Sequence, residues 1–383
     1  MLTVQEIDFF DRQSEWGRWK HAILKKYLRI WSYKLGSQHP AIVFVDGCAG
    51  VGLYGDGTEG SPVLAARLND DLAVSARTSL FVVAFEEMAD NRKRLKVALS
   101  PWLSRRPPLA FVFGSSFDEG LREIEHVIAD LPTLYFIDPY GMMDLTRENL
   151  RPVLQSQAAR HELLLRVDDV LLARWAGQLR SADKSPQQQK RAVAFFKRLE
   201  AAGLDMSETL LLAHSMLAKG ELRELLLEDY LRQFEERFRY LQLIPIRPSY
   251  QAAPKYFLLF CTNSPDGAAA MNDVVGTTED EIWEDGERRR EHESGQGTLF
   301  YAPRPVGATS KTAADAIWKI LVEAGGRMEW ITIRAELAQT FGSDLRERHH
   351  KVAVLSLADS GVIRPLPEKL ARSSLIELAD PSV

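Results

Sequence analysis

Five short runs of strand-forming residues, separated by helical stretches, constrain the fold of this chain more than any other feature. The runs are almost continuously apolar, and several of them end at an acidic residue. They lie at 41–46, 79–87, 109–119, 133–141 and 161–167. Strands that are apolar on both faces and alternate with helices are typical of a parallel sheet covered by helices on both sides. The sequence therefore predicts an α/β fold with a doubly wound, mostly parallel sheet.

The segments around these runs complete a predicted seven-stranded sheet. Residues 1–40 are expected to form N-terminal helices, and about 170–239 a helical insertion. Strands near 241–247 and 255–261 follow, and they are expected to pair as an antiparallel hairpin at the edge of the sheet. The main domain is therefore predicted to span 41–275.

A change of composition marks the C-terminal part of the chain. Residues 276–305 are charged, contain glycine and have almost no aliphatic side chains, so they are predicted to form a linker or mobile arm in which protease cuts first. Helical periodicity returns over 309–371, with three short helices and a possible terminal hairpin. Residues 306–383 are therefore expected to form a winged-helix-like domain.

Composition and charge limit the classes of function. The 383 residues are 45% hydrophobic, which is enough for a core, and the net charge of −5 gives no overall basic signature. A nucleic-acid partner would therefore need a local basic patch. The two cysteines, Cys48 and Cys261, are far apart and have no zinc-ligand spacing, so no metal is expected. The chain shows neither a signal peptide nor an apolar run long enough for a membrane helix, and we expect a cytoplasmic protein without a membrane partner.

A glycine-rich loop, FVDGCAGVGLYGDGTEGSP, follows the first predicted strand at 44–62. Gly47, Gly50 and Gly52 would let the chain turn and let a ligand approach the backbone amides. The spacing matches neither the dinucleotide fingerprint nor the phosphate loop. Ligands of doubly wound sheets bind beyond the carboxyl ends of the strands, so the loop is a candidate binding site. The alternative is an ordinary glycine-rich turn between a strand and a helix.

The pattern acid–Gly–x–Ala–Gly–x–Gly resembles the first motif of class I S-adenosylmethionine-dependent methyltransferases. The matching positions are Asp46, Gly47, Cys48, Ala49, Gly50 and Gly52. This resemblance implies a Rossmann-like fold and S-adenosylmethionine as the cofactor. It further implies that Glu86 accepts hydrogen bonds from the ribose hydroxyls, that Phe117 packs on the adenine and that Asp118 accepts from the adenine amino group. Lys20, on the helix before the first strand, is a candidate partner of the methionine carboxylate or else a solvated lysine.

The fourth predicted strand ends in DPYG, which resembles the [DNS]PP[YF] motif of methyltransferases that act on amino groups. By this resemblance Asp138 and the Pro139 carbonyl would hold N–H donors of the acceptor, and Tyr140 would stack on its ring. Positioning supplies most of the catalysis in such a transfer, and no strong base is needed. The motif departs from the pattern at Tyr140, which puts base methylation in doubt. The alternative is that Asp138 only closes the cofactor pocket.

A longer resemblance covers about residues 15–170. The segments WKHAILKKYLRIW, VDGCAGVGLYGDGTEGSP, FEE and FIDPYG are similar to the bacterial three-Cys-motif partner (TcmP) family. This resemblance implies a partner, a radical-SAM-like protein with three cysteines. The family commonly has an aromatic residue at Cys48, so that thiol is expected to be a small buried hydrophobe and not a nucleophile.

Basic residues gather in the third helix of the predicted C-terminal domain. Arg346, Arg348, His349 and Lys351 would contact phosphates and base edges if that helix bound DNA or RNA, although many winged helices bind only protein. The first functional reading is therefore a methyltransferase acting on a nucleobase nitrogen in DNA or RNA. The alternatives are a cofactor-binding partner subunit with little turnover of its own and a methyltransferase for a small molecule or peptide.

Overall fold

A computed structural model of the chain describes most of its residues. They are 13–75, 78–139, 145–156, 160–168, 197, 219–247, 249, 252–294, 304–367 and 369–380. Most of the predicted helical insertion lies outside them, and the part that is described is residue 197 and the segment from α11 (Lys219–Glu235) onward. None of the described helices is long and apolar enough to span a membrane.

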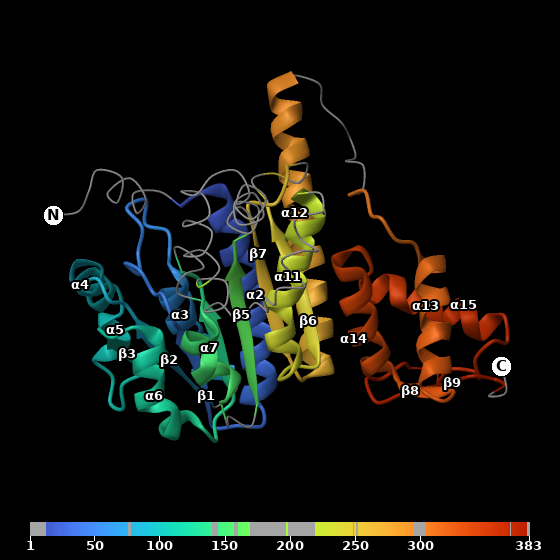
Figure 1. The fold of residues 1–383 in the computed structure, drawn as a ribbon, viewed down its shortest axis with the longest axis horizontal. Helices are drawn as coiled ribbons and strands as arrows, with labels where there is room; N and C mark the ends of the chain where they lie inside the picture. Colours follow the sequence, from blue (N-terminus) through green and yellow to red (C-terminus); the bar gives the residue numbers. More distant parts are fainter. Residues whose placement is uncertain are drawn as a thin grey trace.

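A seven-stranded sheet with the order β3-β2-β1-β4-β5-β7-β6 forms the centre of the fold (Figure 1). Its strands are β1 (Ala41–Asp46), β2 (Ser79–Phe85), β3 (Ala110–Phe113), β4 (Thr133–Ile137), β5 (His161–Val167), β6 (Tyr240–Ile246) and β7 (Tyr256–Thr262). The first five strands are parallel, whereas β7 is antiparallel to both of its neighbours. The predicted doubly wound, mostly parallel sheet is confirmed. The order reverses between β1 and β4, which is the switch point where such sheets bind ligands.

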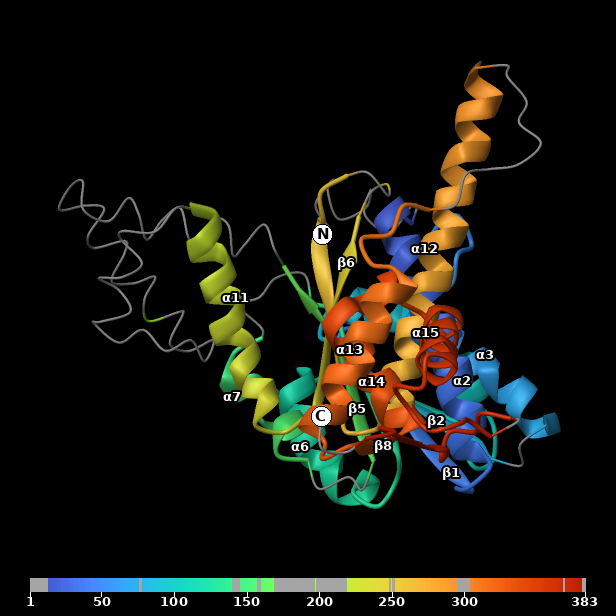
Figure 2. The same ribbon diagram turned by 90° about the vertical axis from the view of Figure 1, so that its right-hand side faces the viewer.

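Helices cover both faces of the sheet because its strands are apolar on both faces. Along β1, Ile42 and Phe44 enter one core, while Val43 and Val45 enter the other. The helices α2 (Glu15–Gly36), α3 (Ser61–Ser75) and α12 (Pro265–Ser294) cover the first face, and α6 (Phe117–Ile128), α7 (Arg147–Leu154) and α11 cover the second (Figure 2). Two further helices, α4 (Ala89–Ala98) and α5 (Ser100–Leu103), follow β2.

The C-terminal elements surround a core of their own. They are α13 (Ser310–Glu323), β8 (Arg327–Glu329), α14 (Trp330–Phe341), η3 (Gly342–Asp344), α15 (Glu347–Asp359) and β9 (Leu375–Glu377). The strands β8 and β9 form a two-stranded antiparallel sheet. Ile317, Ile333 and Val354, one from each helix, are fully buried in this core. In Figure 1 these elements lie beside α12 and β6.

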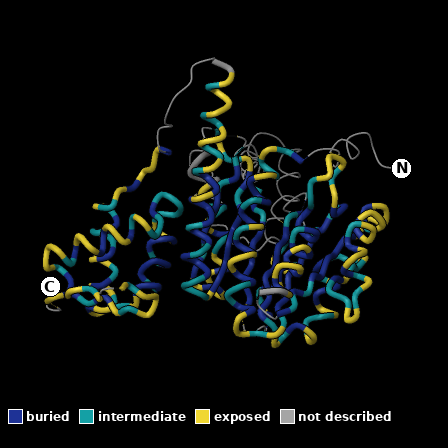
Figure 3. The backbone as a smooth tube through the Cα atoms, turned by 180° about the vertical axis from the view of Figure 1, so that it is seen from behind, coloured by how far each residue is buried: buried dark blue, intermediate teal, exposed yellow. Residues whose placement is uncertain are grey.

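The prediction of a linker at 276–305 is wrong for residues 276–294, because α12 continues without a break to Ser294. Distant partners hold the charged residues of this helix. Lys26 of α2 bonds to Glu281 at 2.5 Å and to Thr278 at 3.2 Å, and Arg346, the N-cap residue of α15, pairs with Asp280. The last turns of α12 extend beyond the sheet and are largely exposed (Figure 3). Composition could not reveal partners that lie far away in the sequence.

Candidate functional site

The loop after β1 has a left-handed backbone, which favours glycine, at Gly50, Gly52 and Gly57. Gly50 and Gly52 have φ angles of 63° and 78°, in the left-handed region that side chains disfavour. The amide of Gly60 donates to the carbonyl of Gly52 at 2.7 Å, which closes the loop before α3. A Cβ atom added to Gly47 would lie 3.3 Å from Phe117 Cβ, so the loop also passes close to the start of α6. The sequence correctly indicated that this stretch needs backbone freedom.

Glu86 joins the end of β2 to this loop. Its Oε2 accepts a hydrogen bond from the Gly50 amide at 2.9 Å, and its Oε1 accepts from the Met88 amide at 2.9 Å. Burial raises the pKa of this carboxyl group, although the two amides partly oppose the rise. Each carboxylate oxygen has a second acceptor position. Glu86 can therefore hold the loop and still accept hydrogen bonds from a ligand.

Phe117 and Asp118 lie in the first turn of α6, beyond the end of β3. Phe117 is buried and faces Gly47, whereas the Asp118 carboxylate lies 3.5 Å from the guanidinium of Arg122. The structure therefore brings the loop, Glu86 and Phe117 together at one edge of the sheet. The predicted adenine contact of Asp118 stays a prediction.

Asp138, directly after β4, lies between two cations. Its Oδ2 accepts a hydrogen bond from Lys20 of α2, and its Oδ1 lies 3.6 Å from Nη1 of Arg166. Burial by itself would raise the pKa of Asp138, but Lys20 and Arg166 outweigh it and lower the pKa below its ordinary value. Burial would likewise lower the pKa of Lys20, but Asp138 reverses this and the pKa is raised. The partner of Lys20 is thus Asp138, and its predicted contact with a methionine carboxylate stays a prediction.

A cavity of about 420 Å³ joins the glycine loop to this ion pair. Its walls are α2, residues Cys48 to Gly52, Asp138 and the beginning of β7. The rings of Trp16, Tyr54 and Tyr256 line it, and the Arg166 guanidinium lies 4.4 Å from the centre of the Tyr256 ring. Glu86 bonds to the loop and Phe117 lies beside it, but the lining of the cavity includes neither of them, nor Asp118.

Several lining residues were not predicted as site residues, among them Tyr54, Arg166, Lys255 and Tyr256. Because β7 is antiparallel, its first residues lie at the edge where the parallel strands end. The predicted hairpin already implied this position of the first residues of β7, since an antiparallel strand after β6 must begin at that edge. Arg166 belongs to β5, near its carboxyl end, where the same rule places ligand contacts.

The remaining predicted residues have different positions. Pro139 is buried directly after Asp138, and Tyr140 lies outside the described residues. Cys48 is half-buried, packs against the core and lines the cavity. His21 lines the cavity beside Lys20, and burial together with the Lys20 charge lowers its pKa to about 3, so it is neutral at pH 7.

The residues predicted to contact nucleic acid at the start of α15 differ in their burial and in their partners. Arg346 is mostly buried and pairs with Asp280 of α12, so it fixes α15 to that helix. Arg348 and Lys351 are exposed, and Lys351 lies 2.8 Å from Glu347. The ring of His349 accepts from the Arg346 amide at 3.1 Å, and burial and Arg348 lower its pKa. Arg348 and Lys351 are thus the predicted contacts that remain open to a phosphate.

Comparisons with known proteins give distant similarities of fold. No protein-family model matches this sequence, and no curated protein matches it. A protein from Klebsiella pneumoniae described as an O-methyltransferase is 14% identical, with a TM-score of 0.31, over 63% of this chain and 80% of that chain. Spermidine synthase from Thermotoga maritima is 10% identical over 73% of this chain and 68% of its own, with a TM-score of 0.32. The plantazolicin methyltransferase BamL is 14% identical over 68% of this chain and 91% of its own, with a TM-score of 0.29. Similarities of this size identify no substrate, so the chemistry of the site rests on its own geometry.

Proposed function

We propose that the protein is an S-adenosylmethionine-dependent methyltransferase. The observation that carries this proposal is the closed glycine loop at the switch point of the sheet, with the carboxylate of Glu86 bonded to the amide of Gly50. Left-handed glycines let the loop turn so that a ligand can approach its backbone closely, and an acid at the next strand end suits vicinal hydroxyls. When bound, the cofactor supplies a methyl group on a sulfonium.

The residues present fit this cofactor in three respects. The cavity beside the loop has a volume within the ordinary range for small-molecule sites. Phe117 offers an aromatic ring directly beside Gly47, where an adenine would pack. Lys20 places a cation in the wall of the cavity, which suits the carboxylate of the methionine part.

For the acceptor, we propose a ring or exocyclic nitrogen held by Asp138. Lys20 fixes Oδ2 of this carboxylate, whereas Oδ1 is buried and accepts no hydrogen bond from the described residues. Oδ1 can therefore accept an N–H of the acceptor and aim the nitrogen lone pair at the methyl group. His21 is neutral and weakly basic, and burial raises the pKa of Tyr256 to about 12, so orientation and not proton removal is the contribution of these side chains.

The proposals for the class of acceptor, the companion protein and the C-terminal domain follow from the sequence. The rings of Trp16, Tyr54 and Tyr256 suit a planar acceptor, and we propose a nucleobase in DNA or RNA. We also propose that the chain is a TcmP-type protein with a radical-SAM-like three-cysteine companion, and that residues 306–383 form a winged helix that targets the substrate. One observation favours the alternative of a partner subunit with little turnover: Lys20 already occupies one oxygen of Asp138.

Calorimetry with S-adenosylmethionine and S-adenosylhomocysteine tests the cofactor site. We expect both to bind, and Asp138→Asn to leave their affinity nearly unchanged. Absence of binding at millimolar concentration would remove the enzyme assignment.

Mass spectrometry of tRNA, rRNA and DNA, incubated with the protein and the cofactor, tests the acceptor. A gain of one methyl group that disappears with Asp138→Asn would support the nucleobase. Cofactor binding without any such gain would leave the partner subunit or a small-molecule acceptor as the function.

A further inference from the structure

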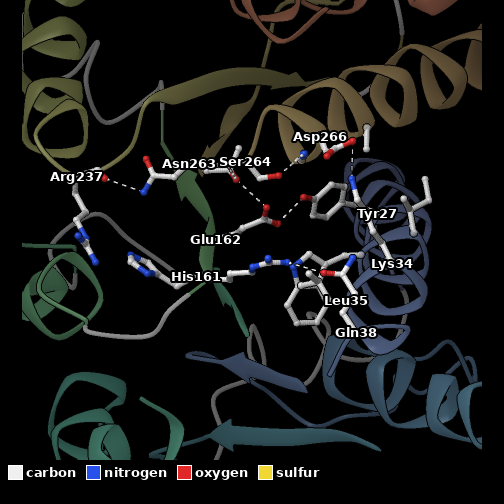
Figure 4. A pocket seen from close by; sticks show the side chains of 16 residues that line it. Tyr27, Lys34, Leu35, Gln38, His161, Glu162, Arg237, Asn263, Ser264 and Asp266 are labelled. Carbon is white, nitrogen blue, oxygen red and sulfur yellow. Dashed lines mark hydrogen bonds and ion pairs between the residues drawn. The ribbon is translucent and has the colours of Figure 1, made fainter. Parts of the chain in front are cut away.

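A second cavity, of about 580 Å³, lies at the opposite edge of the sheet, where β5 begins and β7 ends (Figure 4). We name it the amino-edge cavity and define it by Tyr27, Trp31, Lys34, Glu162, Thr262 and Asp266. Its volume is that of an ordinary small-molecule site. Its lining shares no residue with the cavity at the glycine loop. The rule that ligands bind at the carboxyl ends of the strands does not account for it.

Glu162 is a buried carboxyl group that accepts hydrogen bonds from two hydroxyl groups. The hydroxyl of Tyr27 donates to Oε2 at 2.5 Å, and that of Thr262 donates to Oε1 at 2.7 Å (Figure 4). The amide of Ser264 donates to the Thr262 oxygen at 2.9 Å, which directs the hydroxyl proton of Thr262 toward Glu162. Hydrogen bonds donated to a carboxylate favour its ionised form. Only 6% of Glu162 is exposed.

No cation among the described residues forms an ion pair with Glu162. The nearby ammonium of Lys34 instead bonds to Asp266 at 2.6 Å. Burial raises the pKa of Glu162 against the effects of the two hydroxyls and of the nearby Lys34 charge, because a charge held away from water is costly. A cation bound in the cavity would offset this cost. The rings of Tyr27 and Trp31 line the same cavity, and aromatic faces attract organic cations.

Two other polar groups of the cavity are hydrogen-bond donors that suit the carboxylate of a ligand. Nε1 of Trp31, a residue that is only 4% exposed, has no hydrogen-bond partner among the described residues. Arg160 also lines the cavity, where its guanidinium donates to the side chain of Gln38 at 3.2 Å. An indole N–H and a guanidinium are donors that a carboxylate can share. The cavity thus combines the acceptor Glu162, beside the Lys34–Asp266 ion pair, with donors for a negative group of the ligand.

We propose that the amino-edge cavity binds a small zwitterion, an ammonium compound that also carries a carboxylate. Glu162 is the counter-ion of the ammonium group, between the rings of Tyr27 and Trp31. The indole N–H of Trp31 and the guanidinium of Arg160 receive the carboxylate. This site goes beyond the proposed methyl transfer and does not depend on it.

Calorimetry on the full-length chain with three probes of similar length tests the proposal. The probes are γ-aminobutyrate, butylammonium and butyrate. We expect γ-aminobutyrate to bind most tightly and butyrate least tightly. Glu162→Gln should weaken both ammonium probes by about ten-fold or more, because a charge-assisted hydrogen bond is lost. Glu228→Gln, an exposed acid on α11, is the matched control and should change nothing.

A second variant keeps the test decisive if Glu162→Gln does not fold. Trp31→Phe retains an aromatic ring but loses the N–H, so it should weaken γ-aminobutyrate and leave butylammonium unchanged. Three results would overturn the proposal: butyrate binding more tightly than both amines, unchanged amine affinity in Glu162→Gln, or no amine binding at about 10 mM. None of these measurements involves S-adenosylmethionine, so failure here is distinct from failure of the proposed function.

Discussion

Replacing Asp138 by alanine should destabilise the fold as well as impair the site. In Asp138→Ala the ammonium of Lys20 stays in a place where only 10% of its side chain is exposed, without the carboxylate that now neutralises it. Arg166 is affected less, because Asp168 also lies 3.6 Å from its guanidinium. The variant thus leaves one buried charge uncompensated.

The two partners of this ion pair should differ in their effect on stability. Removing one member of a buried pair costs about 3–5 kcal/mol, and we expect this loss for Asp138→Ala. Lys20→Met should cost less, about 1–3 kcal/mol, because Arg166 still faces the Asp138 carboxylate. The double variant should lose less unfolding free energy than the sum of the two single losses, since the two charges mainly compensate each other.

Urea unfolding followed by circular dichroism measures these losses, and its pH dependence has a definite sign. Burial opposes the charge of Asp138, yet Lys20 and Arg166 lower its pKa, so its contribution is present above about pH 3.9 and is lost as the pH falls through the folded-state pKa. The pKa of Lys20 is raised, so its contribution is present below about pH 10.4 and is lost only at higher pH. The difference in unfolding free energy between wild type and Asp138→Ala should therefore be constant from about pH 5 to 9 and shrink in acid.

Two outcomes would refute this reasoning. A loss below about 1 kcal/mol for Asp138→Ala would mean that the pair is solvated like a surface salt bridge. Equal losses in the two single variants would mean that Arg166 does not compensate Asp138.

Three other perturbations test separate parts of the molecule. Glu86→Gln should weaken S-adenosylmethionine binding by about ten-fold in calorimetry, since one charge-assisted acceptor is lost, and unchanged affinity would contradict its role. Gly52→Ala should lower the unfolding free energy by more than Gly57→Ala. Both glycines have φ near 80°, but a Cβ at Gly52 would meet other atoms within 4 Å, whereas a Cβ at Gly57 would meet none. Equal losses in urea unfolding would contradict this argument from packing. Arg346→Ala should lower the melting temperature of the chain by calorimetry, whereas the exposed Arg348→Ala should not, and equal effects would show that the ion pair to α12 is unimportant.

The parts of the fold that could be predicted from the sequence are those coded by neighbouring residues. The continuous apolar runs at 41–46 and 133–141 predicted buried parallel strands because such strands contact helices on both faces. The glycines of the loop likewise predicted a backbone that needs conformational freedom, which the positive φ angles of Gly50 and Gly52 confirm.

The features that could not be predicted depend on residues that are distant in the sequence. The pairing of Lys20 with Asp138 joins a helix to a strand end 118 residues later, and no local pattern encodes it. Tyr256 reaches the cavity only because β7 is inserted antiparallel beside β5. Residues 276–294 were interpreted as part of a linker or mobile arm for the same reason, since the partners of their charged side chains belong to α2 and to the N-cap of α15.

The continuity of α12 decides how the chain can be divided for expression in separate halves. Met271 and Val274 of this helix pack in the core of the sheet domain, while Asp273 pairs with Arg334 at 2.6 Å and Asn272 donates to the carbonyl of Leu345 at 2.7 Å. Ending the chain at residue 275, where composition changes, would sever one helix in its middle. A sheet domain produced alone would need to extend to Ser294. It would then present to water the acidic side of α12 that three arginines now cover, and its solubility and charge would differ from those of the intact protein.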